Sequence, residues 1–347
     1  MKTLIKYEIK TNLPIILIFM VGAALFGGTL FYDSMNAYNS YVRLGTSSYM
    51  VIDMVSIILH LAFYCSAILT MVMVFFQFKQ VKNDDISEFI LSLPVTTKTI
   101  IISKMMVGIG TILIVNTMAT IFFILTWVKT NFWISDARAL RFAGEIESQY
   151  DTIPAIITMV LIYTLNIILV YLFLVMMQFV IKRAGASVTV SLLGALSIPY
   201  ILVFVAQLFK NSGLGNLIQD ITTRFIKTFT FYNVNTAIYQ EETFMGFISY
   251  RKMGIRELIL VFGILFCITT IFYMNKKVGF TEFRSFCYSK RCDILLKMGV
   301  TICSLIAPFY IAYIWSIQNY YIYMPISAIG GYLVINRFII KDRESGV

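Results

Sequence analysis

Long uncharged apolar runs alternate with short charged segments along this chain. Leu13 to Phe31, Ile153 to Ile181 and Ala186 to Phe209 contain no charged residue. A helix needs about 20 apolar residues to cross the roughly 30 Å of hydrocarbon in a bilayer. The runs therefore predict membrane-spanning helices, because lipid cannot satisfy an open sheet edge and the runs lack the alternation of a barrel strand.

The pattern predicts an all-α fold, a polytopic integral membrane helical bundle of about eight spans. Composition agrees, since 59% of the residues are hydrophobic and only 13% are charged, against about 25% charged in an average soluble domain. The first run is longer than the core of a signal peptide and no clear cleavage site follows, so we expect a retained anchor. The predicted limits are 13–32, 50–76, 100–128, 153–181, 186–209, 257–275, 295–315 and 322–340.

The lysines and arginines predict the orientation of these spans. Most of the 28 basic residues fall in cytoplasmic segments if the N- and C-termini are both cytoplasmic, as the positive-inside rule favours. The loop 210–256 argues against this orientation, because it lies outside yet carries several basic residues. The net charge of +10 would then meet anionic lipid head groups. Nucleic-acid binding is not expected, since the charges are scattered among the spans.

The first ten residues allow two interpretations. Lys2, Lys6 and Lys10 fall on one arc of a helix and apolar residues on another, although Glu8 lies within the apolar arc. Such a segment forms either a separate helix along the membrane surface or a positively charged flank of the first span.

The segment between the second and third spans, Gln77 to Lys104, predicts a short amphipathic helix and a turn. Asp85 is placed to cap the helix, with Glu88 as its capping-box partner. Pro94 ends the helix and moves the preceding residue out of the α region. The helix is too short to cross a bilayer, so its apolar face lies against lipid or in a groove of another protein. That face follows helical spacing and consists of Ile86, Phe89, Ile90 and Leu93.

Glu88 to Lys104, EFILSLPVTTKTIIISK, resembles the coupling segment of ABC-2-type transporter permeases. These share an acidic residue, a leucine-rich turn, a Ser-x-Pro-Val pattern or similar, and a lysine entering the next span. Tyr273 to Phe280, YMNKKVGF, resembles the basic end of the family's six-span unit. The resemblance implies a six-span permease-like domain at 1–280. Residues 281–347 form an additional two-helix hairpin, which departs from the commonest form.

The resemblance implies a separate ATPase that docks on the coupling segment, which we define as Asp84–Thr97. The sequence contains no G-x-x-x-x-G-K-[ST] phosphate loop, so ATP and Mg²⁺ would be bound by this partner and no cofactor by the chain itself. The expected complex has two ATPases and two permease subunits, identical or sister chains, in a bacterial cell membrane. The residues expected to contact the ATPase are Asp85, Glu88, Phe89, Leu91, Leu93 and Pro94.

The loop between the fifth and sixth spans also contains an amphipathic pattern. Leu217, Ile218, Ile221 and Phe225 lie on one helical face. The resemblance implies short outer-face helices that dip toward the membrane. A surface loop with one amphipathic turn is the alternative.

Few polar residues suggest chemistry inside the spans. Asp53 and His60 share a helical face. They form either a proton relay or an interfacial carboxylate and a hydrogen-bonded neutral histidine. Cys287 and Cys292 form a C-x4-C pair, but zinc needs about four ligands and the chain has 1 histidine. No metal site is therefore expected.

The sequence predicts the permease subunit of an ATP-driven exporter and not an enzyme. A secondary carrier is an alternative, which would need more buried charge and internal repeats. A membrane scaffold or sensor is another. An intramembrane hydrolase would need paired carboxylates, a nucleophile with its base, or a metal set. The double glutamate of QEETFMGFISYRK, Gln240 to Lys252, is not followed by a partner histidine motif.

Overall fold

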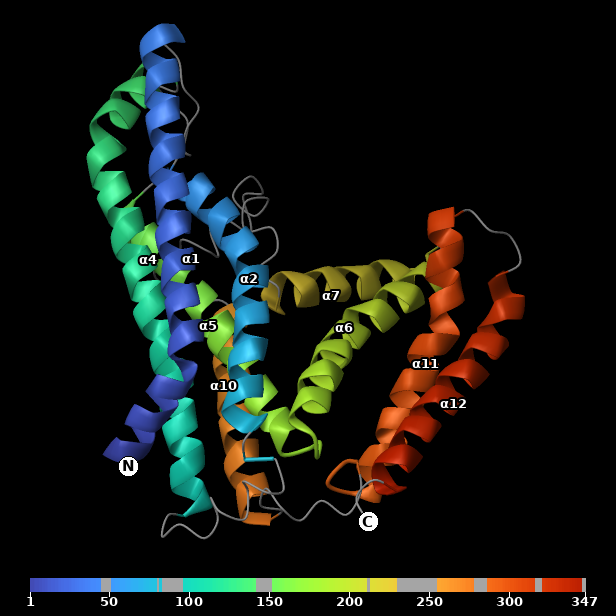
Figure 1. The fold of residues 1–347 in the computed structure, drawn as a ribbon. Helices are drawn as coiled ribbons and strands as arrows, with labels where there is room; N and C mark the ends of the chain where they lie inside the picture. Colours follow the sequence, from blue (N-terminus) through green and yellow to red (C-terminus); the bar gives the residue numbers. More distant parts are fainter. Residues whose placement is uncertain are drawn as a thin grey trace. The chain divides into compact units, whose positions relative to one another are not determined.

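The computed structural model describes most of the chain, almost entirely as α-helices (Figure 1). The described residues are 1–44, 51–79, 81–82, 96–141, 152–210, 213–229, 255–277, 286–315 and 320–344. The helices are α1 (Lys2–Leu44), α2 (Val51–Lys79), α4 (Thr97–Arg141), α5 (Ile153–Gln178), α6 (Ala184–Leu208), α7 (Gly213–Phe229), α10 (Ile255–Lys277), α11 (Lys290–Trp315), the 3₁₀ turn Tyr320–Ile322 and α12 (Tyr323–Glu344).

Eight of these helices are long and apolar enough to cross a membrane. They coincide with the eight predicted spans, so the all-α, multi-pass integral membrane fold is confirmed. The helices extend beyond the hydrophobic limits where polar residues continue the same helix, as α4 does at both ends. The cytoplasmic location of the termini stays a prediction.

The helices form two compact units, each discontinuous in sequence. Unit 1 comprises Met1–Gln77, Thr99–Leu172 and Lys227–Cys267. Unit 2 comprises Phe78–Lys98, Phe173–Ile226 and Ile268–Val347. The predicted division of the chain at residue 280 stays a prediction, and that residue lies outside the described part.

Unit 1 is built around α5, which lies among α1, α2 and α4 (Figure 1). Within the apolar 18-residue stretch of each helix, 72% of the residues are buried in α5, against 39% in α2 and in α4. Polar and small residues bring the neighbouring helices together. The Ser66 and Tyr163 hydroxyl groups join α2 to α5 at 2.7 Å. A Cβ atom on Gly27 of α1 would lie 2.7 Å from the Phe122 Cβ of α4. Glycine is therefore the residue that permits this close packing of two membrane helices.

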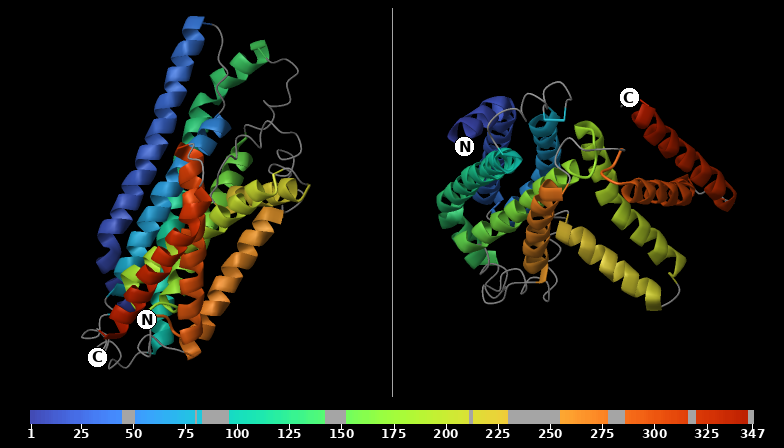
Figure 2. Two further views of the ribbon diagram at one scale, coloured as in Figure 1. Left: turned by 90° about the vertical axis from the view of Figure 1, so that its right-hand side faces the viewer. Right: turned by 90° about the horizontal axis from the view of Figure 1, so that it is seen from below.

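In unit 2, α11 and α12 form an antiparallel hairpin that packs on α6. The two hairpin helices lie side by side in every view (Figure 2). Pro308 within α11 lacks the N–H that would bond the carbonyl of Ser304, and the Ser327 hydroxyl of α12 donates to that carbonyl instead. On the other side, the Tyr310 hydroxyl donates to the Tyr200 carbonyl of α6 at 2.6 Å, and the two rings stack. The proline thus leaves the Ser304 carbonyl free to accept a hydrogen bond from α12, and this bond joins the two helices.

α7 is the amphipathic helix expected between the fifth and sixth spans, and it turns back sharply from the end of α6 (Figure 1). The turn requires a glycine, because a Cβ atom on Gly215 would overlap the backbone carbonyl of Phe209. On the predicted apolar face, Leu217 and Ile221 are 55% and 49% exposed. An amphipathic helix with this face uncovered is suited to the membrane interface.

The first ten residues do not form a separate helix along the membrane surface, which was one of the two interpretations of the sequence. α1 is continuous from Lys2 to Leu44, with Pro14 inside it. A proline costs a helix one backbone hydrogen bond, yet membrane helices tolerate it when neighbouring groups compensate. The first ten residues are therefore the first turns of the helix that contains the first span. This agrees with the other interpretation, a positively charged flank of that span.

Candidate functional site

A buried ion pair joins α1 to α4 within unit 1. The Lys104 Nζ lies 2.5 Å from the Glu8 Oε1, and the two side chains are 4% and 6% exposed. Taking two charges out of water costs several kcal/mol per ion, and only good geometry with further hydrogen bonds offsets that cost. The residues around the pair should therefore supply such bonds.

Hydrogen bonds extend from the ion pair to α2 and α5. The Tyr171 hydroxyl of α5 lies 3.0 Å from both the Gln77 Oε1 of α2 and the Lys104 carbonyl of α4. The Gln77 side-chain amide also donates to that carbonyl at 3.3 Å. Four helices thus meet at one point. We call Glu8, Asn12, Gln77, Lys104 and Tyr171 the buried polar cluster.

Asn12 is the least satisfied member of the buried polar cluster. Its side chain is fully buried, and its Nδ2 donates to the Glu8 carbonyl at 2.8 Å. Its Oδ1 has no hydrogen-bond partner among the residues that the structure describes. An unpaired buried acceptor costs about 1–3 kcal/mol, so the cluster retains an acceptor that a proton donor would stabilise.

The buried polar cluster lies close to the two helix ends that flank the coupling segment. Gln77 is in the last turn of α2, which ends at Lys79. Lys104 lies in α4, about 10 Å along the helix from its start at Thr97. The cluster therefore ties both ends of the α2–α4 connection to α1 and α5.

The ATPase-contact residues predicted from the sequence are Asp85, Glu88, Phe89, Leu91, Leu93 and Pro94, and all of them lie outside the described residues. Their role stays a prediction. Asp53 belongs to α2, but its side chain also lies outside the described part. The His60 ring packs edge-on against Tyr64 with ring centroids 5.4 Å apart. The proton relay between Asp53 and His60 is therefore untested.

Metal ligation finds no support within the described ranges. They contain no group of three or more His, Cys, Asp or Glu residues placed to hold a metal ion. Cys287 is buried and hydrogen-bonded to Cys292, and its backbone N–H donates to the Asp293 carboxylate at 2.9 Å. These contacts hold the chain segment that leads into α11.

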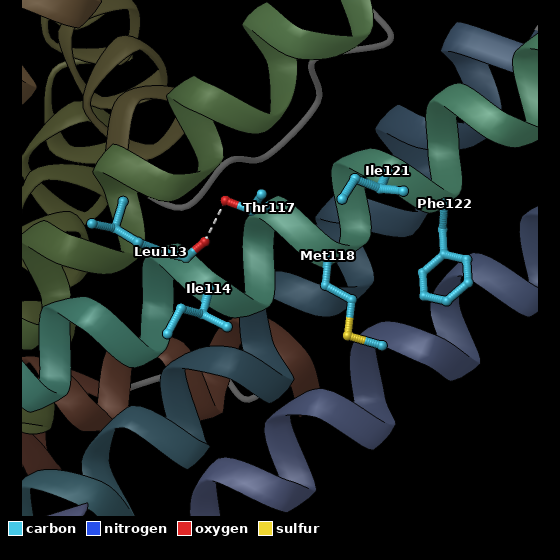
Figure 3. A pocket seen from close by; sticks show the side chains of 6 residues that line it. All are labelled: Leu113, Ile114, Thr117, Met118, Ile121 and Phe122. Carbon is cyan, nitrogen blue, oxygen red and sulfur yellow. Dashed lines mark hydrogen bonds between the residues drawn. The ribbon is translucent and has the colours of Figure 1, made fainter.

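A shallow groove of ≈ 390 Å³ runs along one face of α4 (Figure 3). Its one hydroxyl, on Thr117, donates to the Leu113 carbonyl at 2.8 Å within the same helix. The groove therefore presents apolar side chains and offers no acid, base or nucleophile to a bound molecule. Its lining residues are Leu113, Ile114, Thr117, Met118, Ile121 and Phe122.

The sequence contained a signal for part of the buried polar cluster. Glu8 interrupted an apolar arc, and Lys104 lay within the first turns of the third predicted span. Charged residues in such places need a partner within the protein. The two residues are separated by 96 positions, so their pairing depends on which helices are neighbours. Gln77 carried no signal because it follows the second predicted span, where polar residues are expected, and Tyr171 carried none because a tyrosine is compatible with an apolar span.

Gly108 leaves the space in which the Tyr171 ring sits. A Cβ atom on Gly108 would overlap the phenol ring and its oxygen, whereas a Cβ atom on Gly110 of the same helix would meet no described atom within 4 Å. We expect Gly108→Ala to displace the hydroxyl from Gln77 and to destabilise the protein by about 1–3 kcal/mol. Gly110→Ala should be neutral or slightly stabilising. Thermal unfolding of both variants in one detergent checks this, and equal behaviour would contradict the packing described.

No family model, curated protein or solved structure matches this chain. The fold therefore defines the class, a multi-pass integral membrane protein with a charged cluster buried among four helices. The ABC-2 resemblance rests on the residues of the coupling segment and of the basic end at Tyr273–Phe280.

Proposed function

We propose that this chain is the membrane-spanning permease subunit of an ATP-driven ABC exporter. The observation that supports the proposal most is the buried polar cluster, which links the ends of α2 and α4 to α1 and α5. A docking segment transmits force only if its flanking helices are firmly held. Here the helices on both sides of the coupling segment share one hydrogen-bonded cluster.

The proposed mechanism needs a partner with two states. An ATPase bound to the coupling segment shifts the permease only if its affinity for the two permease conformations differs. Movement of the segment would displace the ends of α2 and α4 together, and α1 and α5 would follow through the Glu8–Lys104 pair and Tyr171. ATP and Mg²⁺ belong to the partner in this proposal, and the permease lines the export path.

A proton-coupled secondary carrier is the second candidate, and one observation favours it. Ionisable residues buried in membrane helices often mark proton or ion pathways. Glu8 and Lys104 are such residues, and the Asn12 Oδ1 beside them is an acceptor that no described residue pairs with. In a carrier the Glu8 carboxylate would take up and release a proton during transport.

Purification of the chain with its partners separates the two candidates. We expect a tagged full-length chain, extracted in mild detergent, to retain an ATPase that contains a phosphate loop. That ATPase should be encoded next to the permease, and the complex should hydrolyse ATP. Reconstitution of the chain alone gives the opposing test. Transport driven by a proton gradient in vesicles without any ATPase would overturn the exporter proposal.

A further inference from the structure

Lys82, two residues before the coupling segment, contacts the loop between α5 and α6. Its backbone N–H donates to the Phe78 carbonyl at 3.1 Å, which continues the turn after α2. Its Nζ donates to the Ile181 carbonyl at 2.6 Å. The Phe78 and Phe179 rings meet edge to face beside this contact. The segment that follows α2 is thereby fixed to residues 179–183.

The same loop pairs with the segment that leads into α11. Residues 286–289, which we call the strap, form an antiparallel bridge with Ile181 at Cys287. The Lys182 N–H donates to the Phe286 carbonyl at 3.0 Å, and the Tyr288 N–H donates to the Val180 carbonyl at 2.9 Å. The Asp293 carboxylate of α11, 2% exposed, then accepts the Cys287 N–H.

A small apolar core joins the loop and the strap to both hairpin helices. Ile181, Phe286, Cys287 and Ile339 are almost fully buried together. Ile339 belongs to α12, and the partly buried Leu296 of α11 packs against the same group. A displacement of Ile181 therefore disturbs the base of the hairpin, because packed interiors do not deform continuously.

We propose that Lys82 links the coupling segment to the α11–α12 hairpin through the α5–α6 loop and the strap. The hairpin would then move with the coupling segment, which gives a role to the two helices beyond the six-span unit. The contact itself is independent of the proposed function, whereas its purpose, the transmission of ATPase-driven motion, rests on that function.

The contact of Lys82 with the Ile181 carbonyl carries a pH-dependent cost. Burial lowers the pKa of Lys82 from 10.5 to about 7. The unfolded chain therefore binds more protons than the folded chain between these two pH values, so stability rises with pH across that window. At lower pH the folded state carries the full penalty of a buried ammonium group. A neutral or charged amine still donates to the Ile181 carbonyl, so the contact persists throughout.

Alkylation of Cys287 measures whether Lys82 holds the strap. The Cys287 side chain is 1% exposed, and the hydrogen bond with Cys292, burial and the nearby Asp293 raise the pKa of its thiol. The full-length chain is used with the other cysteines replaced by serine or alanine, so that N-ethylmaleimide reports Cys287 alone. The replaced residues are Cys65, Cys267, Cys292 and Cys303.

We expect Lys82→Met to accelerate alkylation of Cys287 by at least about tenfold, which corresponds to about 1.4 kcal/mol in the opening of the strap. Lys79→Met is the matched control, since Lys79 is exposed in the last turn of α2, three residues before Lys82, and it should leave the rate unchanged. Asp293→Ala should also accelerate alkylation. Asp293→Asn, which keeps an acceptor oxygen, should change the rate little.

Equal rates for Lys82→Met and its parent overturn the proposal, whatever the Asp293 variants show. Should Lys82→Met not elute as a single species in gel filtration, Lys82→Leu, which also lacks a side-chain donor, carries the same prediction. The test needs no ATPase, so it is separate from the test of the proposed function. If the ATPase complex is obtained, a bound ATP analogue should alter the Cys287 rate in the parent and not in Lys82→Met. A nucleotide effect that persists in Lys82→Met would exclude Lys82 as the link.

Discussion

Glu8→Ala should lower the free energy of unfolding by about 3–5 kcal/mol, because it leaves the Lys104 ammonium group buried without its partner. Lys104→Ala should have a similar cost, since it leaves the Glu8 carboxylate buried without its partner. For a chain of this size either change lowers the melting temperature by several degrees. Thermal unfolding of the purified parent and variants in one detergent measures this fall in melting temperature. Lys10→Ala, an exposed lysine on the same helix, is the control that should change little.

The double variant Glu8→Met/Lys104→Met shows whether the two charges depend on each other. Removal of both charges abolishes the cost of either unpaired ion, and apolar replacement of a buried pair is often neutral or stabilising. We therefore expect the double variant to be more stable than each alanine variant. Additive losses would contradict a direct pair.

The same double variant also separates the two candidate functions. In an exporter the pair holds helices together, so a stable apolar replacement should retain transport. In a proton-coupled carrier the Glu8 carboxylate itself takes up the proton, so the variant should fold and transport nothing. Transport assays on a variant of proven stability decide between these outcomes.

Glu88→Ala should weaken binding of the ATPase by about 30-fold, as expected for one residue worth about 2 kcal/mol at the centre of an interface. Transport should fall with it, while the amount of chain inserted in the membrane stays the same. Phe89→Ala should act in the same way, because both residues are among the predicted contacts with the ATPase. Ser87→Ala in the same segment is the control and should leave binding and transport unchanged.

Normal transport by Glu88→Ala and Phe89→Ala at normal expression would count against docking at this segment. Loss of membrane insertion instead would assign these residues to folding. Titration of the ATPase onto the purified permease, read as ATP hydrolysis, distinguishes weak docking from a damaged permease, since a high ATPase concentration should rescue only the former.

The spans were predictable because each depends on local hydrophobicity alone. Every predicted run corresponds to a helix long enough to cross the bilayer, since a helix satisfies all of its backbone groups within one continuous apolar segment. The amphipathic pattern of Leu217, Ile218 and Ile221 likewise predicted a helix, α7. The sequence left open whether the first ten residues continue into the first span, because Pro14 ends most helices and is tolerated only where neighbouring groups compensate.

The buried polar cluster could be predicted only in part, because it depends on contacts between distant residues. Glu8 and Lys104 were visible as charges in apolar surroundings, but nothing in the sequence paired them. Tyr171 reaches the cluster only because Gly108 leaves room for its ring. The link from Lys82 to the strap was equally hidden, since its acceptor is a backbone carbonyl that any residue type provides.

The most direct test of the proposed function is to measure on which side of the membrane the coupling segment lies. A single cysteine introduced as Ser92→Cys in a chain without other cysteines is treated with a membrane-impermeant maleimide. We predict no labelling in intact cells and full labelling in inverted vesicles, with Asn216→Cys in α7 showing the reverse. Labelling of Ser92→Cys from outside intact cells would contradict the account, because no cytoplasmic ATPase could reach the segment.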